Sequence, residues 1–366
     1  MTAAENVQRK KLRGGQVRRL LDAAAALTPR RAPIGEPRRI GILLSWGVGD
    51  SVQTLPLLQA VRRRWPQAEI VALGKSWLEE LMGDEGLFDA YADLTPPWTR
   101  HLGKYRLWDR HWLRFRGQIV ALRRYPFDLL IGVRPDPRDV LLARLLRPRA
   151  YAGLAVFGGG NWISCDLGRG LDDPGNQPGP ALAAHAALQL TGLEAAPVAR
   201  FAGASARPAP REAPVLAVAF GASHPIRRWN GPAISRVLAG VRARPGKLIA
   251  IDHEDGPDFA APPSWDLERW RGNLHGLKAM LAGIDVVFCT DSGVMHIADA
   301  AGCKVVTLFT SGNISRFAPP GQSIYAVEPM PCRPCGDHCI YPVPLCVERI
   351  DEAAVSALLE RALNEV

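Results

Sequence analysis

Hydrophobic residues in this chain gather in short continuous runs separated by amphipathic stretches. The runs have the length and the Val, Ile and Leu content of buried β-strands, and they cover residues 39–45, 69–73, 129–133, 215–220, 247–251, 284–289 and 304–309. Between the first two runs, Leu55, Leu58 and Val61 recur three positions apart, which is typical of a helix. Short continuous strands alternating with helices favour parallel sheets covered on both faces, so we expect an α/β fold.

The chain is long enough for two domains. It has 366 residues, and domains commonly contain ~150. The alternation is interrupted at residues 201–214, where Ala, Pro and other small residues dominate. We therefore expect four parts: a basic arm at 1–38, α/β domains at 39–205 and 206–350, and a closing amphipathic helix at 351–366.

Composition and charge narrow the class of protein. With 47% hydrophobic and 22% charged residues, the chain has an ordinary globular composition. Residues 1–39 hold ten basic and three acidic residues, so most of the net charge of +9 belongs to the arm. The arm is either a solvated extension or a basic helix on an anionic membrane surface. The nearly balanced body argues against nucleic acid as a partner.

No run of about 18 apolar residues predicts a membrane-spanning helix. The apolar part of the arm is short and contains Asp22, which argues against a secretory signal. We therefore expect a cytoplasmic protein with reduced cysteines. Any peripheral contact with the inner membrane would be made by the arm.

Two turns of the second domain suit a phosphate group. Asp291 and Ser292 follow a predicted strand and precede a helix that begins near Gly293, where free N–H groups and the positive helix dipole would meet. The turn after the domain's first strand carries Arg227 and Arg228, and guanidinium groups bind phosphate through paired donors. A capped helix without ligand and a surface arginine pair are the alternatives.

The matching turn of the first domain contains Gly47, Gly49 and Asp50. It lacks the third glycine of the dinucleotide fingerprint GxGxxG, which argues against a nicotinamide or flavin oxidoreductase. Asp50 at such a strand edge is either a helix cap or a general base.

Residues 98–124 interleave aromatic side chains with eight basic residues and one acidic residue. Such a segment can stack on sugars and pair with an anionic acceptor, for which Arg100 and Lys104 are candidates. The alternative is an amphipathic helix with a solvated basic face and a buried aromatic face.

Four cysteines cluster in a proline-rich loop at 331–347: Cys332, Cys335, Cys339 and Cys346. Four thiols suit a closed tetrahedral site for structural zinc or iron. Free thiols or disulfides are the alternatives, and we expect no catalysis from this loop.

Together these motifs resemble the lipopolysaccharide heptosyltransferases of glycosyltransferase family 9. The likeness extends over about residues 39–350 and rests on Gly49-Asp50 followed by Pro56-Leu57-Leu58, on Arg227-Arg228-Trp229, on Asn273-Leu274-His275-Gly276, and above all on the stretch Asp291-Ser292-Gly293-x-Met295-His296-x-Ala298.

The resemblance implies a GT-B architecture, in which two Rossmann-like domains face each other across a cleft. It implies inverting transfer of a sugar, heptose from an ADP-heptose-like donor being the first candidate. The acceptor would be a lipopolysaccharide-type or other glycan or glycolipid at the cytoplasmic face of the inner membrane, and no catalytic metal would be needed. The alternatives are a non-catalytic nucleotide- or sugar-binding relative and a protein-modifying heptosyltransferase.

The resemblance also assigns residues. Asp50 would be the catalytic base, and Gly49 would contact the acceptor in the first domain. In the second domain the donor would be bound by Arg227, Arg228, Glu254, Asp291, Ser292, Gly293, Val294, Met295 and His296. For the donor ribose, Asp252 or Asp255 could serve in place of Glu254.

Overall fold

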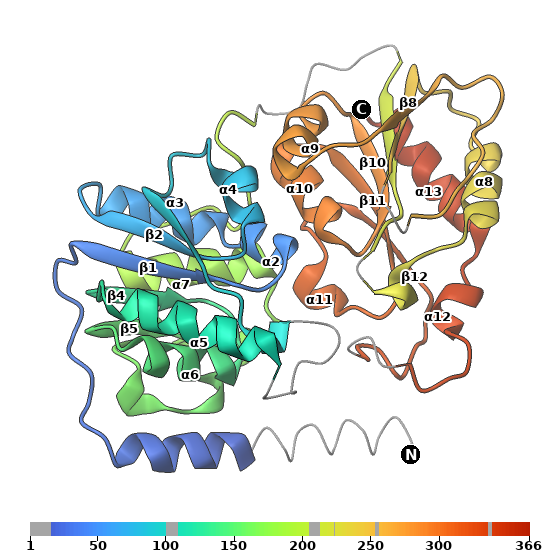
Figure 1. The fold of residues 1–366 in the computed structure, drawn as a ribbon. Helices are drawn as coiled ribbons and strands as arrows, with labels where there is room; N and C mark the ends of the chain where they lie inside the picture. Colours follow the sequence, from blue (N-terminus) through green and yellow to red (C-terminus); the bar gives the residue numbers. More distant parts are fainter. Residues whose placement is uncertain (1–15, 100–108, 205–212, 223, 253–255, 336–338) are drawn as a thin grey trace. The chain divides into compact units, whose positions relative to one another are not determined.

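The computed structural model describes residues 16–99, 109–204, 213–222, 224–252, 256–335 and 339–366. The chain divides into two compact units, residues 1–199 and 200–366 (Figure 1). The sequence places this boundary at 205/206. The difference arises because the Phe201 N–H donates to the carbonyl of Ala300 (3.1 Å), which joins the start of the predicted linker to the second unit.

Unit 1 is built on a six-stranded parallel sheet in the order β3-β2-β1-β4-β5-β6. The central strands β1, β2 and β4 correspond to predicted runs, and nearly all their residues are buried. The strands are β1 (Arg39–Leu44), β2 (Glu69–Gly74), β3 (Ala90–Asp93), β4 (Leu129–Gly132), β5 (Ala150–Gly153) and β6 (Cys165–Asp166).

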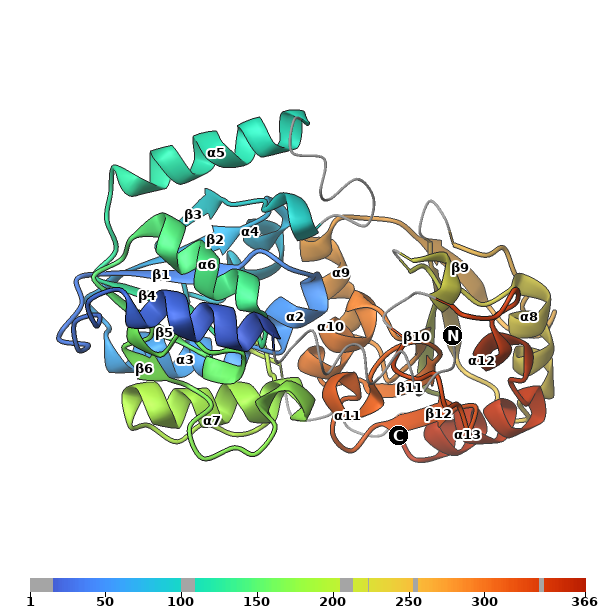
Figure 2. The same cartoon turned by 90° about the horizontal axis from the view of Figure 1, so that it is seen from below.

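Helices cover both faces of this sheet. They are α2 (Val48–Val52), α3 (Leu55–Arg64), α4 (Trp77–Met82), α5 (Arg110–Arg123), α6 (Pro137–Leu146) and α7 (Gly179–Thr191). Four short 3₁₀ turns complete the unit: Pro97–Thr99, Ala155–Phe157, Gly160–Trp162 and Pro174–Asn176. Helices α3 and α7 pack together, whereas α5 and α6 lie on the opposite face with the helix at 16–26 (Figures 1 and 2).

The helix at 16–26 is an integral part of unit 1. Leu21 and Ala25 are buried in its core, and the Asp22 carboxylate accepts from the Gly159 N–H (2.8 Å). At Gly158 (φ +85°) a Cβ would lie 2.5 Å from Asp22 Oδ1, so this contact requires glycine. The described part of the predicted arm is therefore anchored, because its apolar positions fill the space beside α6.

Unit 2 contains a second six-stranded parallel sheet, in the order β12-β11-β10-β7-β8-β9. Its strands are β7 (Val215–Ala219), β8 (Lys247–Ile251), β9 (Leu267–Trp270), β10 (Val286–Thr290), β11 (Lys304–Phe309) and β12 (Ser323–Ala326). Its helices are α8 (Gly231–Gly240), α9 (Leu274–Leu281), α10 (Gly293–Ala301), α11 (Ile314–Phe317), α12 (Leu345–Glu348) and α13 (Glu352–Asn364), with a 3₁₀ turn at Pro225–Arg227. The predicted closing helix is α13, which buries Val355 and Leu359 in the core of this unit.

The strand order reverses direction once in each sheet. In unit 1 the reversal lies between β1 and β4, and in unit 2 between β7 and β10. At such a switch point the connections leave in opposite directions, and the carboxyl ends of the two strands border a crevice in which ligands bind. The candidate turns after β1, β7 and β10 therefore lie where a ligand is expected. No described helix is long and apolar enough to cross a bilayer.

Candidate functional site

The carboxylate of Asp50 lies at the switch point of unit 1. Its Oδ2 accepts a hydrogen bond from the Gly47 N–H (3.3 Å), as a cap of the short helix α2 does. Its Oδ1 lies 2.5 Å from Nη1 of Arg134, and about a quarter of each side chain is exposed. Gly47 follows β1 and Arg134 follows β4, so this ion pair joins the two loops that follow the strands at the switch point. Asp50 is thus a cap, and it also presents a carboxylate at the ligand-binding edge.

Trp46 organises the surroundings of this ion pair. The guanidinium carbon of Arg134 lies 4.0 Å from the centroid of the indole, and that of Arg138 lies 4.8 Å from it. The indole N–H donates to Oδ1 of Asp139 (3.0 Å), and Nζ of Lys75 donates to the Trp46 carbonyl (3.2 Å). The partner of Asp50 therefore lies against an aromatic residue whose ring N–H and main-chain carbonyl are both hydrogen-bonded.

Two titratable groups next to this cluster are perturbed. Complete burial, reinforced by the charge of Asp136, raises the pKa of Asp139 to about 7. Burial also lowers the pKa of Lys75, although the negative charge of Asp50 opposes this shift. Perturbed pKa values are concentrated at functional sites. The sequence analysis did not select Lys75 or Arg134, although both come within two residues after a buried strand and this position was the available signal.

The start of α10 forms a polar seat at the switch point of unit 2. Ser292 is the N-cap residue in an extended conformation, and its side chain makes no capping hydrogen bond. The hydroxyl oxygens of Thr290, Ser292 and Thr310 are all buried without a hydrogen-bond partner among the described residues. Buried hydroxyl groups are normally satisfied. Together with the free N–H groups of the first helical turn, they suit an anionic ligand.

The turn that carries Arg227 and Arg228, here called the arginine turn, contacts this seat. Nη1 of Arg227 lies 3.7 Å from Oδ2 of Asp291, whose side chain is 4% exposed. Arg228 Nε donates to the carbonyl of Ala222 (2.9 Å), which fixes its side chain within the same turn. The structure therefore brings together the two turns that the sequence singled out, and the Asp291 carboxylate contacts a guanidinium rather than open solvent.

The remaining predicted residues of α10 differ in their access to a ligand. Gly293 and Val294 are partly exposed at the helix start. The Met295 side chain is completely buried, and His296 is 7% exposed and contacts the ring of Phe317. The helix thus offers its first turn to a ligand, whereas the Met295 side chain packs into the core and can serve only through its backbone.

Gly312 is a residue of this site that the sequence analysis missed. A Cβ at this position would lie 1.9 Å from Oδ2 of Asp291. The loop after β11 can therefore approach the Asp291 carboxylate only with glycine at position 312. The signal in the sequence was a glycine shortly after a buried strand.

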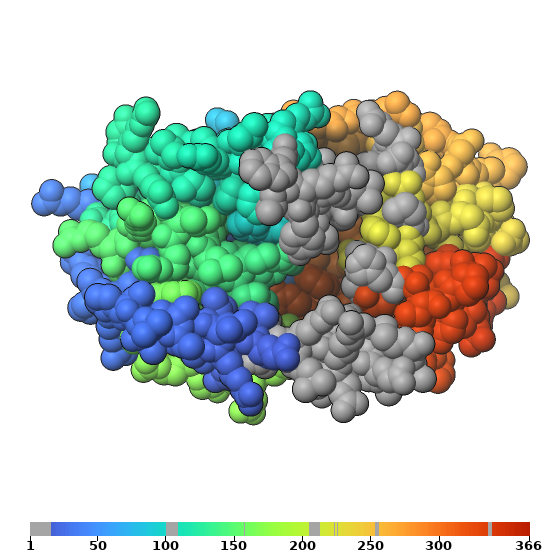
Figure 3. Space-filling model, turned by 60° about the horizontal axis from the view of Figure 1, so that its bottom comes forward, coloured from blue at the N-terminus to red at the C-terminus, as the bar shows by residue number. Residues whose placement is uncertain are grey.

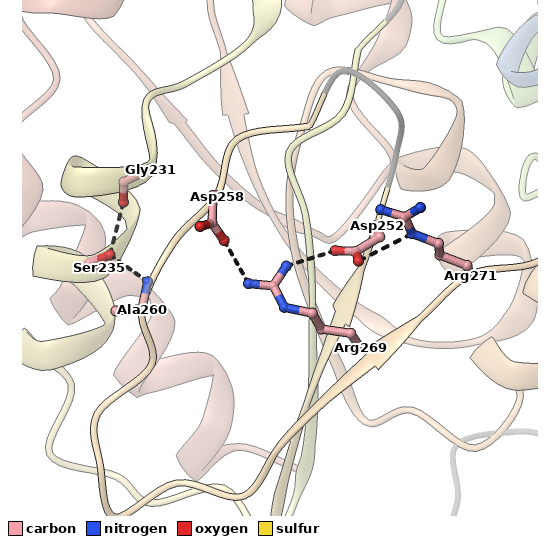
Figure 4. Close-up of polar contacts among 7 residues, drawn as sticks. All are labelled: Gly231, Ser235, Asp252, Asp258, Ala260, Arg269 and Arg271. Atoms are coloured by element: carbon pink, nitrogen blue, oxygen red, sulfur yellow. Dashed lines mark hydrogen bonds and ion pairs between the residues drawn. The ribbon is translucent and has the colours of Figure 1, made fainter.

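The predicted ribose contact Glu254 lies outside the described residues, as does Asp255. The remaining candidate, Asp252, follows β8 and has both oxygens occupied (Figure 4). Oδ1 accepts from Nη1 of Arg269 (3.0 Å) and Oδ2 from Nε of Arg271 (3.4 Å). These side chains and Gly221 line one open pocket beside the arginine turn. A ribose hydroxyl reaching Asp252 would have to share it with these two guanidinium groups.

The predicted acceptor segment proves to be amphipathic where it is described. Trp98, Trp112 and Phe115 pack on one another, with ring centroids 5.2–6.1 Å apart. Arg114 and Arg116 of α5 are exposed. The described aromatic rings therefore support α5 rather than form an open platform for a sugar. Arg100 and Lys104 lie outside the described residues, and Gly49 is buried within α2.

The four loop cysteines line a single small pocket with Ile226 and Thr310. Burial raises the pKa of Cys346 to about 11, and its three neighbouring cysteines add to this shift. Within the described parts of the chain, however, no three His, Cys, Asp or Glu side chains are grouped closely enough to hold a metal ion. Arg333 Nε donates to the Thr310 carbonyl (2.9 Å), which ties the loop to the end of β11.

Two Rossmann-type sheets in one chain, each with polar groups at its switch point, define the GT-B class. Solved structures confirm this fold. The chain is similar to a family 9 glycosyl transferase from Veillonella parvula DSM 2008 (TM-score 0.63, 16% identity, 92% of this chain and 99% of that chain). It is also similar to the ADP-heptose lipopolysaccharide heptosyltransferase II of E. coli (TM-score 0.61, 16% identity, 90% and 99%). The iron-containing dodecameric glycosyltransferase TibC from enterotoxigenic E. coli H10407 is a more distant match (TM-score 0.52, 13% identity, 91% and 78%).

A family model matches part of the sequence. Residues 271–340 match the model of glycosyltransferase family 9 (heptosyltransferase). This segment contains α9, β10, α10 and three of the loop cysteines. The resemblance drawn from the motifs is thereby confirmed, and the protein is a glycosyltransferase with the GT-B fold. No curated protein sequence matches the chain.

Proposed function

We propose that the protein is an inverting heptosyltransferase that uses ADP-heptose and a lipopolysaccharide-type acceptor at the cytoplasmic face of the inner membrane. The observation that carries the proposal is the seat formed by Arg227, Asp291 and Ser292 at the switch point of unit 2. Most of this seat belongs to the segment that matches family 9. The name of the E. coli heptosyltransferase II supports the choice of donor and acceptor.

The seat suits the diphosphate of the donor. Negative charge grows on the diphosphate as the bond from the anomeric carbon to its oxygen breaks. The N–H groups at the start of α10, the hydroxyl of Ser292 and the guanidinium groups of Arg227 and Arg228 would stabilise that charge. Fixed donors of this kind need no rearrangement during the reaction, so this assignment requires no catalytic metal.

Asp50 would act as the general base. The acceptor hydroxyl gives its proton to the carboxylate while its oxygen forms the new bond to the anomeric carbon. The electron pair of the broken bond leaves with the diphosphate. A single displacement of this type inverts the configuration at the anomeric carbon and requires one base within hydrogen-bond reach of the hydroxyl.

Arg134 and Lys75 would be positioning residues for this base. Arg134 holds Oδ1 of Asp50, and the Gly47 N–H holds Oδ2. Fixing both oxygens lowers the cost of orienting the carboxylate toward an incoming hydroxyl. Lys75 adds a positive charge close enough for Asp50 to influence its pKa.

The loop cysteines would hold a structural zinc or iron ion. The four thiols line one pocket, and thiolates are preferred ligands of both metals. The iron-containing TibC shows the same overall fold with a metal. Binding would require the thiols to deprotonate and draw together around the ion. The ion would stiffen a loop that contacts the donor seat and would take no part in bond breaking.

Transfer assays on the full chain test the proposed function. Purified protein is incubated with ADP-heptose and a panel of truncated lipopolysaccharide acceptors and polypeptides, and the products are measured by mass spectrometry. We expect a heptosylated glycan and released ADP. Arg227→Ala should weaken donor binding at least tenfold, whereas Arg244→Gln, an exposed arginine of unit 2, serves as the matched control.

Three other results would change the conclusion. Donor binding without turnover on any acceptor would indicate a non-catalytic relative. Transfer to polypeptides alone would indicate a protein-modifying enzyme. Thermal stabilisation by uridine diphosphate sugars rather than by ADP-heptose would refute the assigned donor, because a ligand that binds the folded state stabilises it by an amount that grows with the ratio of free ligand to Kd.

A further inference from the structure

Three helices form one outer face of unit 1. The helix at 16–26 packs on the core beside α6, and α6 in turn contacts α5. In Figure 3 they appear on the viewed surface as blue, green and teal segments of unit 1. We call residues 16–27, 110–125 and 141–147 the basic face.

The basic face exposes an unusual number of large apolar side chains. Twelve such side chains are exposed among the described residues, and eight of them belong to the basic face. Leu20, Leu27, Leu113 and Tyr125 are each at least 65% exposed. The eight are Val17, Leu20, Leu27, Leu113, Val120, Tyr125, Leu141 and Leu145. Single exposed leucines are ordinary on a protein surface, but their concentration on one face indicates a contact with another apolar phase.

The same surface is strongly positive. Its three ranges contain nine arginines and a single acidic residue, Asp22. Oδ2 of Asp22 lies 3.8 Å from Nε of Arg18. Arg114 forms an ion pair with Asp93, which lies outside the face. The remaining positive charge is largely uncompensated within the face, and Arg19, Arg116 and Arg124 are all exposed. A partner must therefore offer negative charge and an apolar layer together.

We propose that the basic face docks on an anionic lipid bilayer. Arginines would contact the headgroups while Leu20, Leu27 and Leu113 enter the boundary with the acyl chains, as interfacial helices do. Charge complementarity selects anionic lipid, and the interleaved leucines favour a bilayer over nucleic acid, which would not cover them. The inference rests on the proposed function only for its purpose, which is to bring unit 1 to a membrane-borne acceptor.

Binding of the full chain to vesicles tests the inference. Flotation is compared on phosphatidylcholine vesicles and on vesicles containing 30% phosphatidylglycerol, at about 0.05 and 0.3 M salt. We expect binding to anionic vesicles only, weakening as salt screens the arginines. Replacing both Arg19 and Arg116 by Gln should reduce binding about 25-fold, at about fivefold for each charge near the surface. Leu20→Ser with Leu113→Ser should reduce it at least tenfold with all charges retained.

Matched controls separate the face from general effects. Leu188→Ser removes a leucine of α7 that is 45% exposed but outside the basic face, and Arg244→Gln removes an exposed arginine of unit 2. Both should bind vesicles as the parent protein does, and thermal unfolding of each variant verifies folding. Equal binding to neutral vesicles, unchanged binding of the double variants, or tighter binding to single-stranded RNA that ignores the leucine changes would each overturn the proposal.

The proposed function fails separately, because vesicle binding needs no donor. A chain that floats with anionic vesicles but transfers no heptose would retain the docking surface and refute the activity. A chain that transfers heptose to a soluble acceptor but does not bind vesicles would support the activity and refute the docking surface.

Discussion

The strongest single test of the base assignment is Asp50→Asn. In the parent protein the Gly47 N–H donates to Oδ2 of Asp50 (3.3 Å). The amide oxygen of Asn can accept the same hydrogen bond. What disappears is the negative charge opposite Arg134 and the ability to take a proton. The substitution therefore separates the capping contribution of Asp50 from its chemical contribution.

The structure sets the size of the two effects. The ion pair with Arg134 is only about a quarter exposed on both sides. It therefore lies between a surface ion pair, which contributes ~1 kcal/mol or less, and a buried one, whose disruption costs ~3–5 kcal/mol. The Arg134 guanidinium keeps its contact with the Trp46 ring at 4.0 Å, so we expect a loss of ~1–3 kcal/mol, at roughly 2–4 °C in melting temperature per kcal/mol for a unit of this size. Removing a general base should lower kcat by ~10²-fold or more.

Steady-state kinetics and thermal unfolding measure the two effects on the same sample. The KM for ADP-heptose should change little, because the donor seat belongs to unit 2. Asp173→Asn is the matched control, since Asp173 also caps a short turn by accepting from the Gly175 N–H (3.1 Å). If Asp50→Asn keeps kcat within tenfold of the parent protein, Asp50 is a cap and the base must be sought elsewhere.

Three further outcomes follow from the structure. The folded-state pKa of Asp139 is about 7, so between about pH 4 and 7 the unfolded chain releases this proton first and stability falls as pH rises. Asp139→Asn should remove this contribution, which amounts to roughly 4 kcal/mol between pH 4 and 8, as judged by urea unfolding at both values. Gly312→Ala should displace Asp291, because its Cβ would lie 1.9 Å from Oδ2, and should weaken ADP-heptose binding in thermal-shift titrations by about tenfold. Gly283→Ala, whose Cβ would meet nothing closer than 3.6 Å, is its control, and equal affinities would contradict the assigned seat. Chelation, or Cys332→Ser, should release one metal ion per chain in elemental analysis and weaken donor binding, because the cysteine pocket shares Ile226 and Thr310 with the donor turns. Protein that contains no metal when purified would refute the metal assignment.

The central strands could be predicted from the sequence, whereas the outer ones could not. Strands β1, β4, β7 and β10 pair on both sides and read as continuous apolar runs. The edge strands β3 and β9 have the sequences AYAD and LERW and are only partly buried. A strand with one partner and one open side needs no run of large apolar residues, so its pattern does not stand out.

The residues of the candidate site could likewise be selected from the sequence only in part. The two turns proposed for the donor could be selected from the sequence because a helix start and an arginine pair each follow a recognisable strand. The partners of Asp50 could not, since Lys75 and Arg134 are distant in sequence and reach Asp50 only through the strand order. The many basic residues of the arm favoured a solvated or membrane-bound extension, whereas Leu21 and Ala25 in fact belong to the core of unit 1.

Counted from the other edge, the strands of unit 2 have the same order as those of unit 1. Each half of the enzyme is therefore a complete scaffold whose ligand-facing loops can be rewritten without disturbing the strands beneath them. If unit 1 binds the acceptor and unit 2 the nucleotide, as proposed above, a chimaera joined at 199/200 with a relative's unit would take its acceptor preference from one parent and its nucleotide preference from the other. Such recombination would then let one architecture build different glycans.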